Sequence, residues 1–514
     1  MRNTFKLYTM GALLTGALLT TSCSDYLDKL PEGQMPGTSV DFTNTADAYK
    51  PVVGIYGRLA ECAREWGSLG MIAVRGDDVE KGGSSPADQG DLNNFRNFDY
   101  APAKNFWVSN NFWKGYYDVV MKANLALNSL DQFQKYAVKE EDKAKIESYK
   151  YEVRFLRAYA YFQLGRMYGA IPVFTDNNSS DGFFKKSHTE VMQFIIAEAE
   201  ACADALPAVH PANMAHKGAV SRYSALALKA KAAGDILDYD KVLEATQAII
   251  NEGKTDLMAD YYNLFKKAGQ FSSENLFEIQ YTYLNQEAGD AILPNEFFIF
   301  QGPGVGAHFR SEKKFGQNSD QQLGGGWGFL PVTKELSDLM VERGETLRYQ
   351  TTVLKTTGMT DKDGKAYNIT LSNDTLYAGN PGSPVTYNGK AYSPSSELVR
   401  NIYGGDKNII VFRYADILLL DAEAKVQKGQ NGDESFNKVR SRAGMPAMSG
   451  VTFDQILEER FIELACENGE RYFDMVRTGK ALTEWSSRGQ GYTEAKRFYP
   501  IPQEQVDLNP NLGK

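Results

Sequence analysis

Aromatic and charged side chains in two glycine-rich blocks are the residues of this sequence best suited to hold a ligand. The blocks lie at about 66–111 and 255–400 and are rich in tryptophan, tyrosine and phenylalanine. A sugar ring packs its C–H faces on flat aromatic rings, and its hydroxyl groups need fixed donors and acceptors. The candidate ligand-binding residues are Arg75, Asp78, Tyr100, Trp107, Tyr283 and Trp327.

Trp327 is the clearest of these candidates. It lies in the segment Gly324-Gly-Gly-Trp-Gly-Phe329, where the flanking glycines remove side-chain bulk. The indole can therefore stand exposed as a flat platform instead of entering a core. Packing within the loops is the alternative role for the tryptophans and Tyr283, and an ion pair or a turn is the alternative for Arg75 and Asp78.

Signatures of enzymes are missing from the sequence. The four histidines form no H-E-x-x-H motif, and there is no G-x-S-x-G. The segment Glu252-Gly-Lys-Thr255 resembles the end of a phosphate-binding loop, but Ala248 stands where the earlier glycine is needed. We therefore expect no catalytic residue, no metal and no cofactor. A surface glycosidase that uses two carboxylates remains a less favoured alternative.

The N-terminus has the order of features that is typical of a secretory signal. Arg2 and Lys6 precede an apolar run, which gives way to Thr20, Thr21, Ser22 and Cys23. The run is too short to span a hydrocarbon core of ~30 Å comfortably. Residues 1–22 are therefore predicted to be a lipoprotein signal peptide, and Cys23 the lipidated residue that anchors the chain to a membrane. Plain secretion is the alternative, because Thr20 replaces the usual leucine of a lipobox.

Composition limits the possible partners. The formal net charge is -9 and the sequence pI is near 5.3, so a nucleic acid is not an expected partner. A hydrophobic fraction of 42% in 514 residues is enough for a large core. Four cysteines without a C-x-x-C spacing do not indicate a disulfide framework.

Helical periodicity dominates the sequence on both sides of the second block. Apolar residues recur at three- and four-residue steps within 112–131, 146–167 and 415–426, including Trp113, which we assign to the core. Thr452 and Gln455 form a possible capping box. We predict a mostly α fold, with a scaffold of helix pairs at about 40–255 and 400–485. The blocks 66–111 and 255–400 are predicted to be loop-rich, partly β insertions.

Motifs along nearly the whole chain resemble the SusD/RagB family of outer-membrane nutrient-binding lipoproteins. The segments that carry the resemblance are Cys23-Ser-Asp-Tyr-Leu-Asp28, Trp113 to Ala123-Asn124, Arg154-Phe-Leu-Arg-Ala-Tyr-Ala-Tyr-Phe162, Tyr168-Gly169, Ile171-Pro172, Arg413-Tyr-Ala-Asp416, Ala422-Glu423-Ala424, Asn437-x-Val-Arg-Ser-Arg-Ala-Gly444, Glu459-Arg460, Glu463-Leu464, Gly469-Glu-Arg-Tyr-Phe-Asp474, Tyr499-Pro-Ile-Pro502 and Asn509-Pro-Asn-Leu512. Their order makes the resemblance specific, and residues 23–514 are assigned to one SusD-like domain.

The resemblance implies a fold and a function. The fold would be a tetratricopeptide-like scaffold that lids a SusC-like TonB-dependent outer-membrane barrel. The protein would face the cell exterior, capture an oligosaccharide or polysaccharide and deliver it to that barrel. The RagB branch of the family implies peptide capture as the alternative, and Asp25 and Asp28 resemble a surface-export signal.

The charged residues of these motifs are predicted to pair with one another and to be structural. They are Arg154, Arg157, Asp416, Glu423, Arg440, Arg442, Glu459, Arg460, Glu463, Arg471 and Asp474.

Overall fold

The computed structural model describes most of the chain from residue 40 to residue 513. The residues that it does not describe within this range are 178–183, 283–294, 303–306, 312–321, 324–325, 356–358, 361–365, 370–373, 379–385, 395–396 and 398–404. The predicted signal peptide, Cys23, Asp25, Asp28 and Tyr283 therefore lie outside the described residues.

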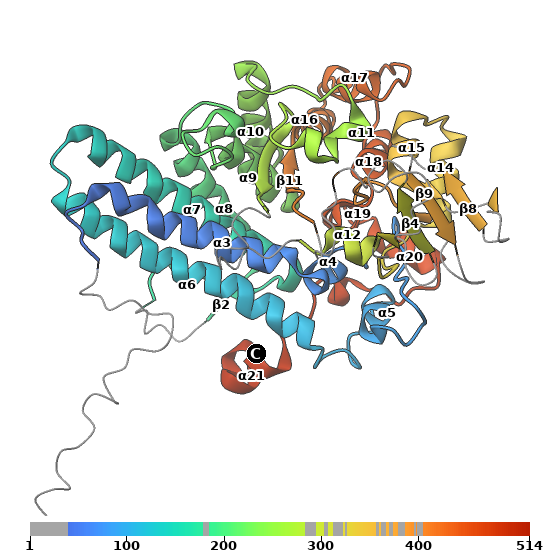
Figure 1. The fold of residues 1–514 in the computed structure, drawn as a ribbon, viewed down its shortest axis with the longest axis horizontal. Coiled ribbons are helices and arrows are strands. Elements are labelled where there is room, and N and C mark those ends of the chain that lie inside the picture. The colour runs from blue at the N-terminus through green and yellow to red at the C-terminus, as the bar shows by residue number, and fades with distance from the viewer. Residues whose placement is uncertain are drawn as a thin grey trace, which may run out of the picture.

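The fold is mostly helical, as predicted (Figure 1). In the N-terminal half the main helices are α3 (Lys50–Arg64), α6 (Trp107–Tyr136), α7 (Glu140–Tyr168), α8 (His188–Ala205), α9 (Arg222–Asp235) and α10 (Tyr239–Glu252). From α6 onward each of these helices packs on the next along the chain, and α3 packs on α6. Trp113 is buried on the inner face of α6, so its assignment to the core is confirmed.

The C-terminal helices extend this scaffold. They are α16 (Tyr414–Gln427), α17 (Asp433–Arg442), α18 (Phe453–Glu463), α19 (Glu470–Arg477), α20 (Ala481–Ser487) and α21 (Gln503–Leu508). Helix α16 packs on α10, and α17 and α18 pack on α16. The capping box is confirmed: Gln455 N donates to Thr452 Oγ1 at 3.3 Å, and Thr452 N donates to Gln455 Oε1 at 2.9 Å.

Short helices and strands fill the two blocks that were predicted to be loop-rich. The first block contains α4 (Trp66–Ala73) and α5 (Gly90–Arg96), so it is more helical than predicted. The second contains α11 (Tyr261–Leu264), α12 (Phe297–Gln301), α14 (Lys334–Glu342) and α15 (Leu347–Thr352). Its strands are β3 (Asn275–Ile279), β4 (Ala307–Ser311), β5 (Gln322–Leu323), β6 (Val353–Lys355), β7 (Met359–Thr360), β8 (Ala366–Ile369), β9 (Asp374–Ala378) and β10 (Thr386–Asn388).

Antiparallel pairing organises these strands. One sheet has the order β5-β4-β9-β8-β7, and β10 pairs with β6. Strand β11 (Ile409–Arg413) pairs with β3, so the strand that leads into α16 joins a strand from the other side of the block. Short strands β1 (Ile171–Pro172) and β2 (Lys185–Lys186) pair beside α7 and α8. The second block is therefore attached to the helices at several separate points.

Buried ion pairs fix the second block to the C-terminal helices. Glu463 of α18 accepts from Arg413 Nη1 at 2.6 Å, from Arg348 Nη1 at 3.2 Å and from Arg442. Arg348 comes from α15 and also contacts Glu459 Oε1 at 2.6 Å. We call Arg348, Arg413, Arg442, Glu459 and Glu463 the Glu463 network. All five are fully or almost fully shielded from solvent in their side chains.

The motif charges are all paired, as predicted, although Arg154, Arg157, Glu423 and Arg471 pair with residues outside the predicted set. Each of the residues named for it forms an ion pair in the structure: Arg154 and Arg157 with Glu198, Arg440 with Glu459, Arg460 with Asp416 and Asp474, Glu423 with Arg477, Arg471 with Asp77, and Arg442 with Glu463.

Candidate functional site

Three tryptophans from separate parts of the chain meet at one surface. Trp66 begins α4, Trp107 begins α6, and Trp327 lies in the second block. The ring centroid of Trp66 is 5.7 Å from that of Trp107 and 6.4 Å from that of Trp327, at interplanar angles of 76° and 81°. We call these residues the tryptophan cluster. Two of them, Trp107 and Trp327, were predicted from the sequence.

The cluster is accessible on one side and supported on the other. Trp107 is 51% exposed, whereas Trp66 and Trp327 are partly buried. Beneath them the buried rings of Phe300 and Phe329 stack at 4.8 Å, and Trp66 lies 5.4 Å from Phe300. The packed rings below hold the orientation of the tryptophans, while solvent reaches Trp107.

Backbone hydrogen bonds position Trp327. Its N–H donates to Ile299 O at 2.6 Å, and Phe329 N donates to Phe300 O at 3.0 Å. A Cβ on Gly326 would lie 2.5 Å from the carbonyl carbon of Gly302, so only glycine allows this approach. Gly326 thus lets the segment lie against the end of α12, a role beyond the exposure for which these glycines were singled out.

Trp66 was missed by sequence reasoning. Its N–H donates to Glu296 Oε2 at 3.0 Å, and Glu296 N donates to Arg64 O at 3.1 Å. A Cβ on the following Gly67 would lie 2.6 Å from Val108 Cγ1, so this glycine lets the starts of α4 and α6 approach each other. The Trp-Gly pair inside the first aromatic block was the signal that could have identified it.

Arg75 lies in the core and not at the tryptophan cluster. It is 0% exposed, and its guanidinium carbon stands 3.9 Å from the ring centroids of both Tyr472 and Tyr499. Its Nη1 donates to Tyr472 Oη and to Arg497 O, each at 3.2 Å. These contacts join the first block to the C-terminal segment, which is a structural role.

Asp78 and Tyr100 also make internal contacts. Asp78 is 2% exposed, and its Oδ2 accepts from Cys466 N at 2.7 Å. Burial raises the pKa of the Asp78 carboxyl to about 6. Tyr100 donates its hydroxyl to Lys496 O at 2.9 Å and packs on Tyr499. Of the predicted site residues that the structure describes, Trp107 and Trp327 therefore belong to the tryptophan cluster, whereas Arg75, Asp78 and Tyr100 make contacts inside the fold.

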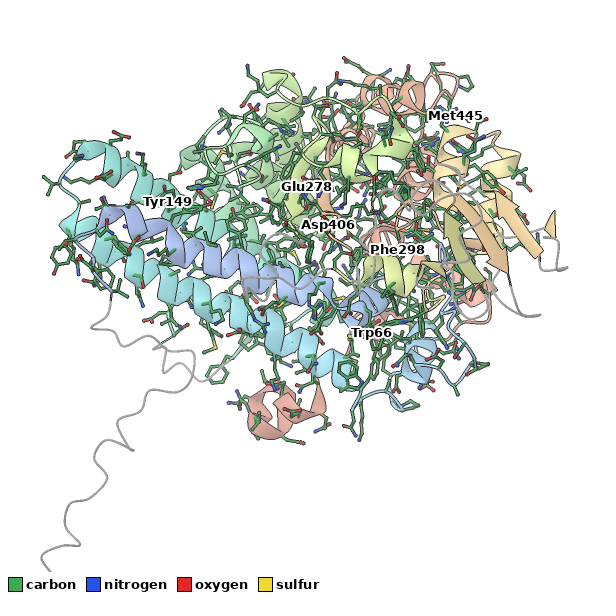
Figure 2. All side chains as sticks on the ribbon, viewed as in Figure 1. Trp66, Tyr149, Glu278, Phe298, Asp406 and Met445 are labelled. Carbon is green, nitrogen blue, oxygen red and sulfur yellow. The ribbon has the colours of Figure 1, made fainter. Side chains whose placement is uncertain are left out.

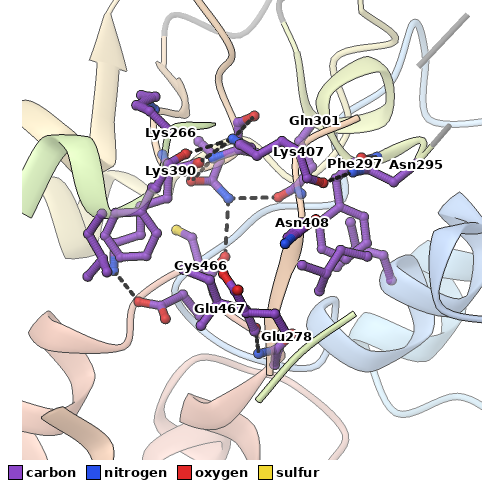
Figure 3. A pocket seen from close by; sticks show the side chains of 18 of the residues that line it. Lys266, Glu278, Asn295, Phe297, Gln301, Lys390, Lys407, Asn408, Cys466 and Glu467 are labelled. Carbon is purple, nitrogen blue, oxygen red and sulfur yellow. Dashed lines mark hydrogen bonds and ion pairs between the residues drawn. The ribbon is translucent and has the colours of Figure 1, made fainter. Parts of the chain in front are cut away.

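A small cavity lies between the second block and the helices (Figure 3). Its volume is about 70 Å³, well below the ~300 Å³ at which ligand pockets begin. Three lysines line it. Lys266 Nζ donates to Gly389 O and Tyr392 O, both at 2.8 Å, and Lys390 Nζ pairs with Glu467 Oε1 at 2.7 Å.

The third lysine of this cavity completes a clamp on one turn. Lys407 Nζ donates to Phe265 O at 2.9 Å and to Lys390 O and Ala391 O at 3.1 Å. Burial lowers the pKa of Lys407 to about 8. Because the lysines are engaged with protein atoms, we assign them to holding the turn at 389–392 and not to a ligand.

In the part of the chain that the structure describes, no group of three or more histidine, cysteine, aspartate or glutamate side chains is arranged to hold a metal ion. In the same residues, no helix combines the length and the apolar character needed to cross a membrane.

Comparison with family models gives two matches. Residues 289–514 match the model described as the SusD family, and residues 25–232 match the model described as "Starch-binding associating with outer membrane". The two matched segments together take up most of the chain and include all three residues of the tryptophan cluster.

Known proteins and solved structures are similar over nearly the full length. SusD-like protein P2 of Formosa agariphila is 26% identical over 96% of both chains, and a SusD-like protein of Bacteroides ovatus is 25% identical over 93% of this chain and 85% of its own. Surface glycan-binding protein A from Bacteroides thetaiotaomicron, in complex with laminarihexaose, has a TM-score of 0.72 at 23% identity, covering 91% of this chain and 98% of that one.

Proposed function

The chain belongs to the SusD/RagB family, and from this we propose that it is a glycan-binding protein whose ligand stacks on the tryptophan cluster. The observation that carries the proposal is the meeting of Trp66, Trp107 and Trp327 at one surface, with Trp107 51% exposed. Apolar groups that gather at the surface mark binding sites more often than single exposed ones do, and flat indoles suit the C–H faces of sugars.

The names of similar proteins support a glycan as the ligand. The Starch-binding protein SusD of Bacteroides thetaiotaomicron is 30% identical over 21% of this chain, and a structural neighbour is called a laminarin binding SusD-like protein. Neither name fixes the glycan for this chain. The indoles of Trp107 and Trp327 lie at 76° and 81° to the indole of Trp66. The cluster therefore presents ring faces in different directions, which suits a curved oligosaccharide.

The proposal extends to the cellular setting. Cys23 carries the lipid that anchors the protein to the outer membrane, where it faces the cell exterior. There it passes captured oligosaccharide or polysaccharide to a SusC-like TonB-dependent barrel. The signal-like residues 1–22 and the family model whose description includes association with the outer membrane support this setting.

Gel retardation tests the proposed function. The chain that begins after Cys23 is run in native gels containing starch, laminarin or another polysaccharide selected on a glycan array, and in a gel without glycan. We expect retardation by at least one glycan, and none for the double variant Trp107→Ala/Trp327→Ala. Binding only to peptides, retardation that survives both substitutions, or enzyme-like release of reducing ends would contradict the proposal.

A further inference from the structure

A cleft lies beside α3, away from the small lysine-lined cavity. Its volume is about 410 Å³, which falls within the usual range of ligand pockets. One wall is the outer face of α3, another contains His216 and Lys217, and the third is formed by β3 and the residues that follow it. We call it the α3 cleft.

The floor of the α3 cleft is open at Gly57. Among the described residues, no atom lies within 4 Å of a Cβ built on Gly57, so α3 exposes its backbone to the cleft at this position. On the adjacent wall His216 stacks on Tyr49 with ring centroids 3.6 Å apart and an interplanar angle of 7°. Because His216 is exposed, the outer face of its imidazole is a flat surface that is already fixed in orientation.

Polar side chains accompany this flat surface. Glu61 and Lys217 line the cleft and are exposed to solvent. Gln280 lines it as well, and its amide Nε2 donates to Lys217 O at 3.2 Å, which fixes the position of the side chain. A flat ring beside a few placed polar groups is the arrangement that recognises a sugar.

One end of the α3 cleft lies close to the residues that hold Trp66. Arg64, the last residue of α3, lines the cleft, and Trp66 follows two residues later, where α3 gives way to α4 (Figure 2). Glu296 links the two by accepting from Trp66 N and donating its own N–H to Arg64 O. Along α3, Gly57 and Arg64 are about 10 Å apart at the helical rise per residue. That spacing is within the length of one extended oligosaccharide.

We propose that the α3 cleft is a second subsite for the glycan held by the tryptophan cluster, so that a long chain occupies both sites and a short one only the cluster. The inference rests on the proposed function of the cluster. It adds that the preferred ligand is an extended oligosaccharide or polysaccharide segment and not a mono- or disaccharide.

Substitution of Gly57 can block the cleft without damage to the fold. Leucine is a better helix former than glycine, and no described residue would meet a Cβ at Gly57, so we expect Gly57→Leu to fill the cleft while α3 is retained. Gly54 is the matched control. It lies one turn earlier in α3, its Cβ would likewise have no neighbour within 4 Å in the described part of the chain, and it is not among the described residues that line the cleft.

Calorimetric titration with sugars of two lengths tests the inference. The probes are laminaritriose and laminarihexaose, and maltotriose and maltohexaose. For the series that binds, we expect the wild type and Gly54→Leu to bind the hexasaccharide about tenfold more tightly than the trisaccharide. In Gly57→Leu the two lengths should bind equally, at the affinity of the trisaccharide.

The outcomes separate the two proposals. A Gly57→Leu variant that keeps the preference for the hexasaccharide, or a wild type that has no such preference, overturns the second subsite alone. Failure of all four probes to bind the wild type, with no glycan retained in the gel experiment, overturns the proposed function and the second subsite with it. Equal loss in Gly54→Leu and Gly57→Leu also contradicts the subsite, because only Gly57 lines the cleft.

Discussion

The tryptophan cluster and the Glu463 network join distant parts of the same chain in opposite ways. The Glu463 network consists of charges buried from solvent and satisfied by one another. The tryptophan cluster consists of uncharged rings that rest on Phe300 and Phe329 and leave half of Trp107 exposed. The side chains of the Glu463 network stabilise the fold, whereas part of the side-chain surface of the tryptophan cluster remains accessible to another molecule.

Because the two arrangements differ in this way, a family can be recognised from residues that do not define its ligand. Apart from Arg348, the charges of the Glu463 network belong to the motifs by which the chain resembles its family, because a buried charge requires its partner at a fixed position. Trp66 and Trp327 lie outside those motifs, in the two aromatic blocks. An aromatic platform needs only a flat ring with support beneath it, so many different segments can supply one.

Removal of the central carboxylate should have the largest effect on stability. Glu463→Ala leaves Arg348, Arg413 and Arg442 without one of their buried partners, which should lower the free energy of unfolding by ~3–5 kcal/mol. Urea denaturation measures the change. Glu140→Ala is the control, because Glu140 pairs with Lys143 at 2.8 Å on the surface with its side chain 87% exposed.

The surface control should change the free energy of unfolding by less than ~1 kcal/mol. Equal effects of Glu463→Ala and Glu140→Ala would contradict the assignment of the Glu463 network to stability.

Acid should weaken the same network. Burial alone would raise the pKa of Glu463, but Arg442, Arg413 and Arg348 lower it to about 2. An unfolded glutamate titrates near ~4.3, so the contribution of Glu463 to stability is complete above that pH and is lost as the pH falls toward 2. The urea midpoint of the wild type should fall between pH 5 and pH 2.5, while Glu463→Ala should lose less over this range. Parallel curves would contradict the prediction.

Asp78 should show a smaller effect with the opposite dependence on pH. Burial raises its pKa to about 6, whereas an unfolded aspartate titrates near ~3.9. Its contribution to stability is therefore present at low pH and is lost as the pH rises through 6. Relative to the wild type, Asp78→Asn should gain on the order of 1 kcal/mol between pH 5 and pH 8. A constant difference across this range would show that the Asp78 carboxyl does not titrate there.

Much of the helical scaffold could be predicted because it obeys a local rule. Apolar residues spaced at three and four positions fix which face of α6 or α7 is buried, and Trp113 is buried as that spacing requires. The Thr452 cap likewise depends on residues three positions apart. The pairing of β3 with β11 could not be predicted, because it joins segments more than a hundred residues apart.

The residues predicted for the site divide into two groups, one that the structure brings to a common surface and one that is enclosed by distant partners. Trp107 and Trp327 were singled out from their aromatic blocks, and the structure brings them together. Arg75 has a charged, hydrogen-bonding side chain of the kind that binds ligands. Tyr472 and Tyr499, which enclose it, lie some four hundred positions later in the sequence. Nothing local in the sequence distinguishes an exposed arginine from one that will be enclosed in this way.

The most direct test of glycan binding at the tryptophan cluster compares two exposed aromatic residues on one helix. Trp107 begins α6 and is 51% exposed, and Tyr136 ends the same helix and is 53% exposed. The two positions are about 44 Å apart at the helical rise per residue. Each is changed to alanine, and affinity for the glycan and the melting temperature are measured on the same sample.

We expect Trp107→Ala to lose ~2 kcal/mol of binding free energy, about thirtyfold in affinity, while its melting temperature stays close to that of the wild type. Tyr136→Ala should keep full affinity. Undiminished binding by Trp107→Ala, or an equal loss in Tyr136→Ala, would contradict the claim that the glycan stacks on the tryptophan cluster.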